Sequence, residues 1–156
     1  MRPCQTARAS HAFKALVRAL VALNPSPGSR MREQVRAMDL RSEVHTDEGC
    51  FIAELSNIPE DADASIARAR VPPGATTRWH RLKGTAERYV ILSGTGRVEI
   101  GKLPPQDVAP NDVVLIPAGC RQRIACTSGE DLVFLAICTP RFRPEAYEDI
   151  DSAAAR

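Results

Sequence analysis

His80 and Glu87 are the residues of this chain whose side chains are best suited to moving a proton. An imidazole changes its charge near neutral pH, and a carboxylate close to it can exchange a proton with it. Arg78 comes shortly before His80 and offers a permanent cation, which can anchor a carboxylate or phosphate group of a ligand. These residue types therefore support the hypothesis of proton-transfer chemistry on a small anionic molecule.

Short strands separated by turns are predicted to position these residues, because the sequence between the turns shows no long helical period. The sequence Gly94-Thr95-Gly96 is interpreted as a short hairpin link between two strands. Many short strands with regularly spaced turns favour an all-β sandwich or barrel. Strands are predicted over residues 66–71, 75–82, 87–93, 97–100, 113–116, 122–126 and 132–138.

The segments around these candidates resemble the two motifs of the cupin superfamily. In the first segment, His80 and Glu87 are framed by Gly74 and Gly94, as in the family's first motif. In the second, the Pro-x-Gly turn at residues 117–119 matches the turn of the family's second motif. The glycines, the turn and their spacing together make the resemblance specific for the fold.

The resemblance covers residues 66–140 and implies an all-β, cupin-like double-stranded β-helix (jelly-roll) barrel with short helical terminal segments. Within the superfamily, the chain looks like the small single-domain cupins that resemble mannose-6-phosphate isomerase. Its metal motif is degenerate. The departures from the family pattern are Leu82 and Gln122 in place of histidines, Asn111 in place of a glycine and Cys126 in place of an asparagine.

If His80 points into the barrel, as the resemblance implies, strand alternation places the other residues of the site. A mostly apolar pocket with a few converging polar groups is typical of a small-molecule site. The interior wall is then expected to include Arg78, His80, Leu82, Glu87, Tyr89 and Gln122. Of these, His80 and Glu87 are the predicted catalytic residues. The predicted substrate-binding residues are Arg78, Tyr89 and Gln122.

The resemblance also raises the question of a metal. One histidine, one carboxylate and one amide form a poor donor set for zinc or for redox-active iron, which favour several nitrogen or sulfur ligands. We therefore expect no tightly bound cofactor. A divalent ion such as zinc, manganese, iron or nickel could be held weakly, with His80, Glu87 and Gln122 as its ligands if it is bound at all.

Three classes of function stay open at this point, because a fold alone does not select among them. The first is a sugar-phosphate isomerase-like or lyase-type enzyme that acts on a small anionic molecule through His80 and Glu87. The second is a metal-dependent cupin enzyme, such as a dioxygenase or a metal isomerase. The third is a non-catalytic cupin that binds or senses a ligand.

Each candidate residue also has a purely structural interpretation. His80 can be a core histidine bonded to a backbone carbonyl, and Tyr89 a packed aromatic. Gln122 can bridge backbone groups, and Glu87 can form an ion pair with Arg78. The relation between Arg78 and Glu87 separates the classes: mutual neutralisation favours binding or structure, whereas separate positions around a cavity favour catalysis.

Length, charge and cysteine content limit the remaining possibilities. A chain of 156 residues is long enough to form one domain with its own core. Its five cysteines show no CxxC pairing and follow no secretory signal, which indicates reduced thiols and a cytoplasmic location. No basic patch interleaved with aromatic residues suggests nucleic acid, and no apolar run is long enough to span a membrane.

The chain is expected to fall into four segments. Residues 1–30 are a basic extension without Asp or Glu, interpreted as a disordered tail or as sequence that precedes a true start at Met31. A targeting presequence or a membrane-surface helix is the alternative for this extension. Residues 31–65 form a lead-in with the first strand, and residues 66–140 the barrel core.

Residues 141–156 are expected to form a C-terminal tail. Pro140 and Pro144 are predicted to end sheet pairing, and a short helix is predicted over Glu145–Ile150. A homodimer is predicted because Trp79 and other outward strand residues would leave an apolar face for a partner to cover.

Overall fold

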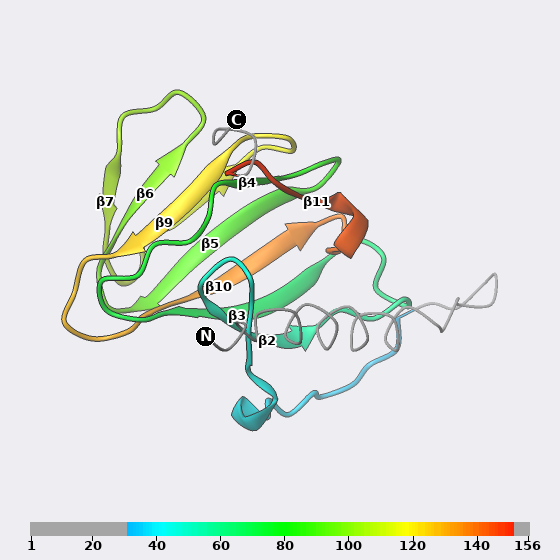
Figure 1. Cartoon of the computed structure of the whole chain (residues 1–156). Coiled ribbons are helices and arrows are strands. Elements are labelled where there is room, and N and C mark those ends of the chain that lie inside the picture. Colours follow the sequence, from blue (N-terminus) through cyan, green and yellow to red (C-terminus); the bar gives the residue numbers. More distant parts are fainter. Residues whose placement is uncertain (1–30, 152–156) are drawn as a thin grey trace, which may run out of the picture.

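Two antiparallel sheets form the framework of the computed structural model, which describes residues 31–151 (Figure 1). The first sheet consists, in spatial order, of β1 (Val44–His45), β2 (Phe51–Ser56), β3 (Ser65–Val71), β10 (Leu132–Thr139), β5 (Ala86–Ser93) and β8 (Val113–Ile116). The second consists of β11 (Tyr147–Asp149), β4 (His80–Leu82), β9 (Gln122–Cys126), β6 (Gly96–Ile100) and β7 (Gln106–Val108). Short 3-10 helices occupy Leu40–Ser42 and Pro144–Ala146. The predicted all-β class is confirmed.

Strand alternation determines which side chains enter the core. Along β5, the inward side chains of Glu87, Tyr89 and Ile91 are buried, and the outward ones between them are more exposed. The same alternation buries Gln122, Ile124 and Cys126 on β9. Apolar side chains from both sheets then form one cluster between them, as expected for sheets that each bury one face.

The link at Gly94-Thr95-Gly96 is not a hairpin. It connects β5 of the first sheet to β6 of the second, so the chain crosses between sheets there. Gly94 has φ +73, and a Cβ on it would lie 2.5 Å from the Asp131 carbonyl oxygen. A Cβ on Gly96 would lie 2.6 Å from a methyl carbon of Leu132. The glycines are required by this close approach of two backbones rather than by a tight turn.

The strand predicted over residues 75–82 is shorter in the structure, where β4 begins only at His80. The residues before it bond to different partners: the Thr77 amide donates to Ile124 in β9, and the Arg78 amide donates to Glu48 in the loop after β1. Because the backbone leaves the ladder here, the alternation that placed Arg78 on the face of His80 does not apply.

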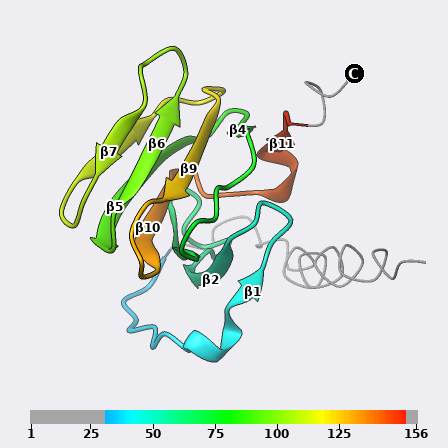
Figure 2. The same cartoon turned by 60° about the vertical axis from the view of Figure 1, so that its left-hand side comes forward.

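The C-terminal segment also differs from its prediction. Residues 144–146 form a 3-10 turn, and β11 follows it as a strand instead of a helix. In this strand, Tyr147 pairs with Leu82 and Asp149 pairs with His80. The pairing is possible because Pro140 and Pro144 precede β11, so every residue of β11 has a backbone amide that can form a hydrogen bond. Figure 2 shows β11 beside β4, and the loop after β1 reaches the same end of the sheet.

The predictions for residues 1–30 fall outside the described part of the chain. Within residues 31–151 there is no helix with the length and hydropathy that a membrane span requires. The thiols of Cys50, Cys120, Cys126 and Cys138 are free.

Candidate functional site

His80 lies at the start of β4 with only 4% of its surface exposed. Its Nδ1 is 2.9 Å from the carbonyl oxygen of Arg78. A carbonyl oxygen can only accept a hydrogen bond, so Nδ1 carries a proton, and in the neutral form of the ring the lone pair lies on Nε2. The ring of Tyr147 stacks on the imidazole at 5.3 Å between centroids. Backbone and aromatic contacts therefore fix the orientation of His80.

The second ring nitrogen of His80 is available to a ligand. Among the described residues, Nε2 has no hydrogen-bond partner. In the same part of the chain, Nε of Arg141 is the fully buried polar side-chain atom without a hydrogen-bond partner. Nε2 of His80 is not such an atom, so it is not fully buried. Nε2 is consequently open to a solvent molecule or to a ligand atom, which is the arrangement that a general base needs.

Glu87 lies on the facing sheet and is 8% exposed. Its Oε2 accepts a hydrogen bond of 2.6 Å from Nε2 of Gln122, and its Oε1 is 3.8 Å from the thiol of Cys138. Burial raises the pKa of Glu87 to about 7, against the lowering effects of the Gln122 amide and the charge of His80. This carboxyl group therefore changes its protonation near neutral pH.

Gln122 and Tyr89 support Glu87 from the core. The Tyr89 hydroxyl donates to Oε1 of Gln122 at 3.0 Å, which directs the amide nitrogen at the carboxylate. Gln122 is completely buried, and burial raises the pKa of Tyr89 well above its usual range. Gln122 thus bridges two side chains rather than backbone groups. The polar ends of Tyr89 and Gln122 are therefore used within the core, and both residues hold Glu87 in place.

Arg78 is not in this interior cluster. Its Nε donates to Asp149 at 2.9 Å, and its side chain is 41% exposed at the end of the barrel next to β11. The ion pair with Glu87 that the sequence allowed is therefore not formed. Arg78 pairs with Asp149 because the irregular backbone before β4 directs it outward, and Glu87 bonds to Gln122 instead.

Two residues that the sequence analysis did not select also belong to the site. Glu48, in the loop between β1 and β2, is half-buried, and the Cys50 thiol lies 3.9 Å from its Oε2. Burial raises the pKa of Glu48, while the charge of His80 and a hydrogen bond from Tyr147 lower it. Glu48 follows a turn and Tyr147 follows two prolines, so no local pattern related either residue to His80.

The residues at the family's metal positions do not fit a tightly held ion. Leu82 is 4% exposed and packs as an apolar side chain where an imidazole would be needed. The oxygen of Gln122 accepts from Tyr89, and both oxygens of Glu87 have donors. Among residues 31–151, no group of three His, Cys, Asp or Glu side chains is arranged to hold a metal ion. The donor set favours chemistry by the side chains themselves.

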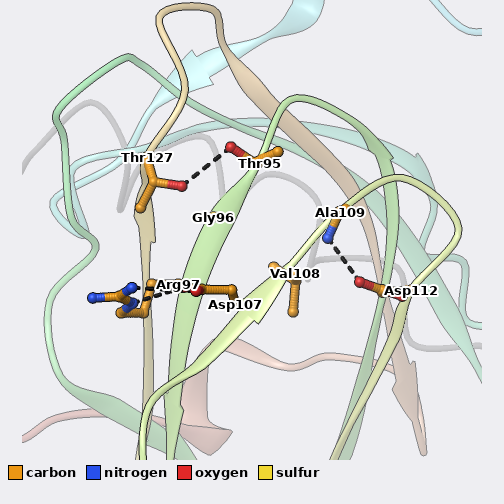
Figure 3. A pocket seen from close by; sticks show the side chains of 8 residues that line it. All are labelled: Thr95, Gly96, Arg97, Asp107, Val108, Ala109, Asp112 and Thr127. Atoms are coloured by element: carbon orange, nitrogen blue, oxygen red, sulfur yellow. Dashed lines mark hydrogen bonds and ion pairs between the residues drawn. The ribbon is translucent and has the colours of Figure 1, made fainter.

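Two surface hollows lie away from this cluster. The first, of about 360 Å³, is lined by residues of β6, β7 and the adjoining loops (Figure 3). In it, Arg97 is paired with Asp107 at 2.7 Å, and the Ala109 amide donates to Asp112 at 2.7 Å. The second, of about 500 Å³, is formed by Met31 and its neighbours against Ser56 and Ile58. Neither contains a predicted site residue, and the polar groups drawn in Figure 3 bond to one another.

Comparisons with known proteins agree with this architecture. Residues 67–138 match the family model described as the cupin domain. A nucleoside dehydratase from Streptomyces is similar at 13% identity and a TM-score of 0.61, over 74% of this chain and 91% of the other. KdgF from Halomonas sp. is similar at 13% identity and a TM-score of 0.59, over 67% of this chain and 94% of the other.

A third similar structure is a predicted oxalate decarboxylase from Thermotoga maritima, at 27% identity and a TM-score of 0.54, over 58% of this chain and 80% of the other. No curated protein matches the chain. Together with the family model, these similarities confirm the double-stranded β-helix fold that the sequence motifs implied.

Proposed function

Because residues 67–138 match the model of the cupin domain, we propose that the protein is a small-molecule enzyme of isomerase or lyase type that moves protons at His80 without a metal. The observation that carries the proposal is the state of the imidazole. Nδ1 is bonded to the Arg78 carbonyl, and Nε2 has no partner among the described residues. A neutral imidazole held in this tautomer is a general base for a proton on a bound ligand.

Glu87 is proposed to support the charge that forms on His80. When Nε2 takes a proton, the ring becomes an imidazolium on a largely buried side chain, and a nearby carboxylate stabilises it. Because the pKa of Glu87 is about 7, this carboxyl group can ionise near neutral pH. Glu87 therefore assists His80 from inside the barrel, while His80 contacts the ligand.

The separation of Arg78 from Glu87 removes one structural explanation of the buried carboxylate, the ion pair between these two residues. Had the two neutralised each other, the interior carboxylate would have been explained by structure alone. Instead Arg78 pairs with Asp149, and Glu87 is held by Gln122. A dehydratase is a lyase, so the nucleoside dehydratase among the structural neighbours is consistent with the lyase form of the proposal.

A ligand screen followed by solvent exchange tests this function. Sugars, sugar phosphates, nucleosides and small acids are screened by thermal shift, and those that bind are incubated in D₂O. We expect NMR to show deuterium at a carbon of the ligand, or loss of a leaving group. His80→Gln should abolish the exchange, whereas the control His45→Gln, an exposed histidine on β1, should retain it.

Two results would overturn the proposal. Stoichiometric metal in the purified protein, with activity lost on chelation, would favour the metal-dependent alternative. Ligands that bind at His80 without any exchange or turnover would favour a binding or sensing cupin. The cytoplasmic location and the absence of a nucleic-acid partner stay predictions from the sequence.

A further inference from the structure

Three separate segments meet around the open nitrogen of His80. β4 provides the histidine, the loop after β1 provides Glu48, and β11 provides Tyr147. The ring of Tyr147 stacks on His80, and its hydroxyl lies near enough to Glu48 to lower the pKa of that carboxyl group. The Arg78 amide donates to the carbonyl oxygen of Glu48, which holds this loop beside β4. The charge of His80 lowers the pKa of Glu48 and of Glu87, so the imidazole is within electrostatic reach of both. We refer to Glu48, Arg78, His80, Tyr147 and Asp149 as the mouth cluster.

The charges of the mouth cluster do not suit an anion. Arg78 is its permanent cation, and Asp149 already neutralises it at 2.9 Å. The neighbouring cations of β4 and its turn are also paired, since both Arg81 and Lys83 contact Glu148. An entering phosphate or carboxylate would have to displace Asp149 and lie beside a second acidic group, Glu48. Bringing an unpaired anion into a partly buried site of this kind is unfavourable.

The same groups suit hydroxyls. In the neutral ring, Nε2 of His80 can accept a hydrogen bond from a hydroxyl. An ionised carboxylate accepts a hydrogen bond from a hydroxyl, and a protonated carboxyl group can also donate one. His80 is only 4% exposed, yet its Nε2 has no hydrogen-bond partner among the described residues. This observation does not depend on the acidic residues, and it indicates a ligand atom at Nε2.

We propose that the ligand of this site is an uncharged, hydroxyl-bearing small molecule that binds Glu48 and Nε2 of His80. The inference rests on the proposed function, and it replaces the anionic ligand expected from Arg78. Glu48 is a ligand-binding residue in this arrangement, and Tyr147 positions it.

Matched pairs of probes test the inference directly. Ribose is compared with ribose 5-phosphate, and uridine with uridine 5′-monophosphate, in the full-length protein. The ring protons of His80, identified by their loss in His80→Gln, are followed by NMR as each probe is added. We expect the uncharged member of a pair to shift them at the lower concentration.

Variants of the two carboxylates separate the contributions. Glu48→Gln should weaken binding of the uncharged probe about tenfold, the effect of losing one hydrogen bond to a charged group. Asp149→Asn should leave the uncharged probe bound and strengthen the phosphorylated one, because it releases Arg78. Tyr147→Phe keeps the stacked ring and should weaken the uncharged probe without altering the fold, as thermal unfolding would verify.

Each alternative outcome has a distinct meaning. Tighter binding of the phosphorylated member, lost in Arg78→Gln, would overturn the uncharged ligand and leave proton transfer at His80 intact. If the Glu48→Gln variant binds ribose or uridine as tightly as the wild type does, Glu48 is not a ligand-binding residue. If no probe shifts the His80 signals, the inference is wrong, whereas the proposed function still depends on the deuterium-exchange result.

Discussion

Nε2 of Gln122 donates a hydrogen bond of 2.6 Å to Oε2 of Glu87. Gln122 stands where the cupin motif has a metal-binding histidine, and Glu87 stands at the motif's glutamate. An amide donor thus occupies the side of the carboxylate that a cation would need. Tyr89 holds the amide in this orientation from behind. The substitution that removes a metal ligand therefore also stabilises the remaining carboxylate without a metal.

Restoring the missing imidazoles should restore metal binding. We expect the double variant Leu82→His/Gln122→His to bind Zn²⁺ or Ni²⁺ close to one ion per chain, because it returns two nitrogen donors beside His80 and Glu87. Replacing the buried Leu82 should lower the free energy of unfolding of the metal-free variant by about 2–5 kcal/mol. Elemental analysis after dialysis measures the uptake. Leu92→His, an exposed position, is the control, and equal uptake by it would contradict the prediction.

The pKa of Glu87 predicts a pH dependence of stability. Burial raises this pKa from 4.5 to about 7, so the folded state binds the proton more tightly than the unfolded state. The stabilisation is complete below pH 4.5 and is lost as the pH rises through about 7. Relative to Glu87→Gln, the wild type should therefore lose up to about 3 kcal/mol between these limits. Urea unfolding at a series of pH values measures it, and parallel curves for the two proteins would contradict it.

Gly94 and Gly74 form a matched pair for the crossing between the sheets. Both have φ +73, but a Cβ would meet the Asp131 carbonyl at Gly94 and nothing within 4 Å at Gly74. Gly74→Ala should cost about 1–2 kcal/mol, the backbone strain of the left-handed region. Gly94→Ala should cost at least about 1–3 kcal/mol more, because the two backbones must move apart. Chemical denaturation compares the variants, and equal losses would show that the close approach is unimportant.

We propose that two copies associate through the outer face of the first sheet. On its edge strand β8, Val113 and Leu115 are 57% and 68% exposed, which leaves an apolar edge open to a partner. Trp79 does not provide this surface, since Arg121 and Arg123 lie over its ring at 4.5 and 4.6 Å.

Sedimentation velocity tests the dimer. The wild type should sediment as a dimer at micromolar concentration, and Leu115→Glu should sediment as a monomer, because a charge would be buried in the contact. Leu103→Glu changes an exposed leucine in the loop between β6 and β7 and should stay dimeric. A wild-type monomer would contradict the proposal.

The sequence by itself determined most of the barrel strands and most of the interior, although it missed β7 and β11. Alternation within a regular strand is a local property, so it placed Glu87, Tyr89 and Gln122 on the inward faces of β5 and β9 before any tertiary contact was known. Wherever the backbone stays in its ladder, this reasoning gave the observed orientation. The hydrogen bond between Glu87 and Gln122 joins two different sheets, so alternation within a single strand could not predict it.

Tertiary structure decided which side chains surround His80. Arg78 turns outward because its amide bonds to the Glu48 carbonyl in a distant loop, which interrupts the alternation on which its prediction depended. Glu48 and Tyr147 reach His80 from a loop and from a strand near the C-terminus, and such contacts depend on the path of the whole chain. A sequence pattern reports the direction of a side chain along its own strand. Its partner from another segment, and with it the charge of the site, is set only when the chain is folded.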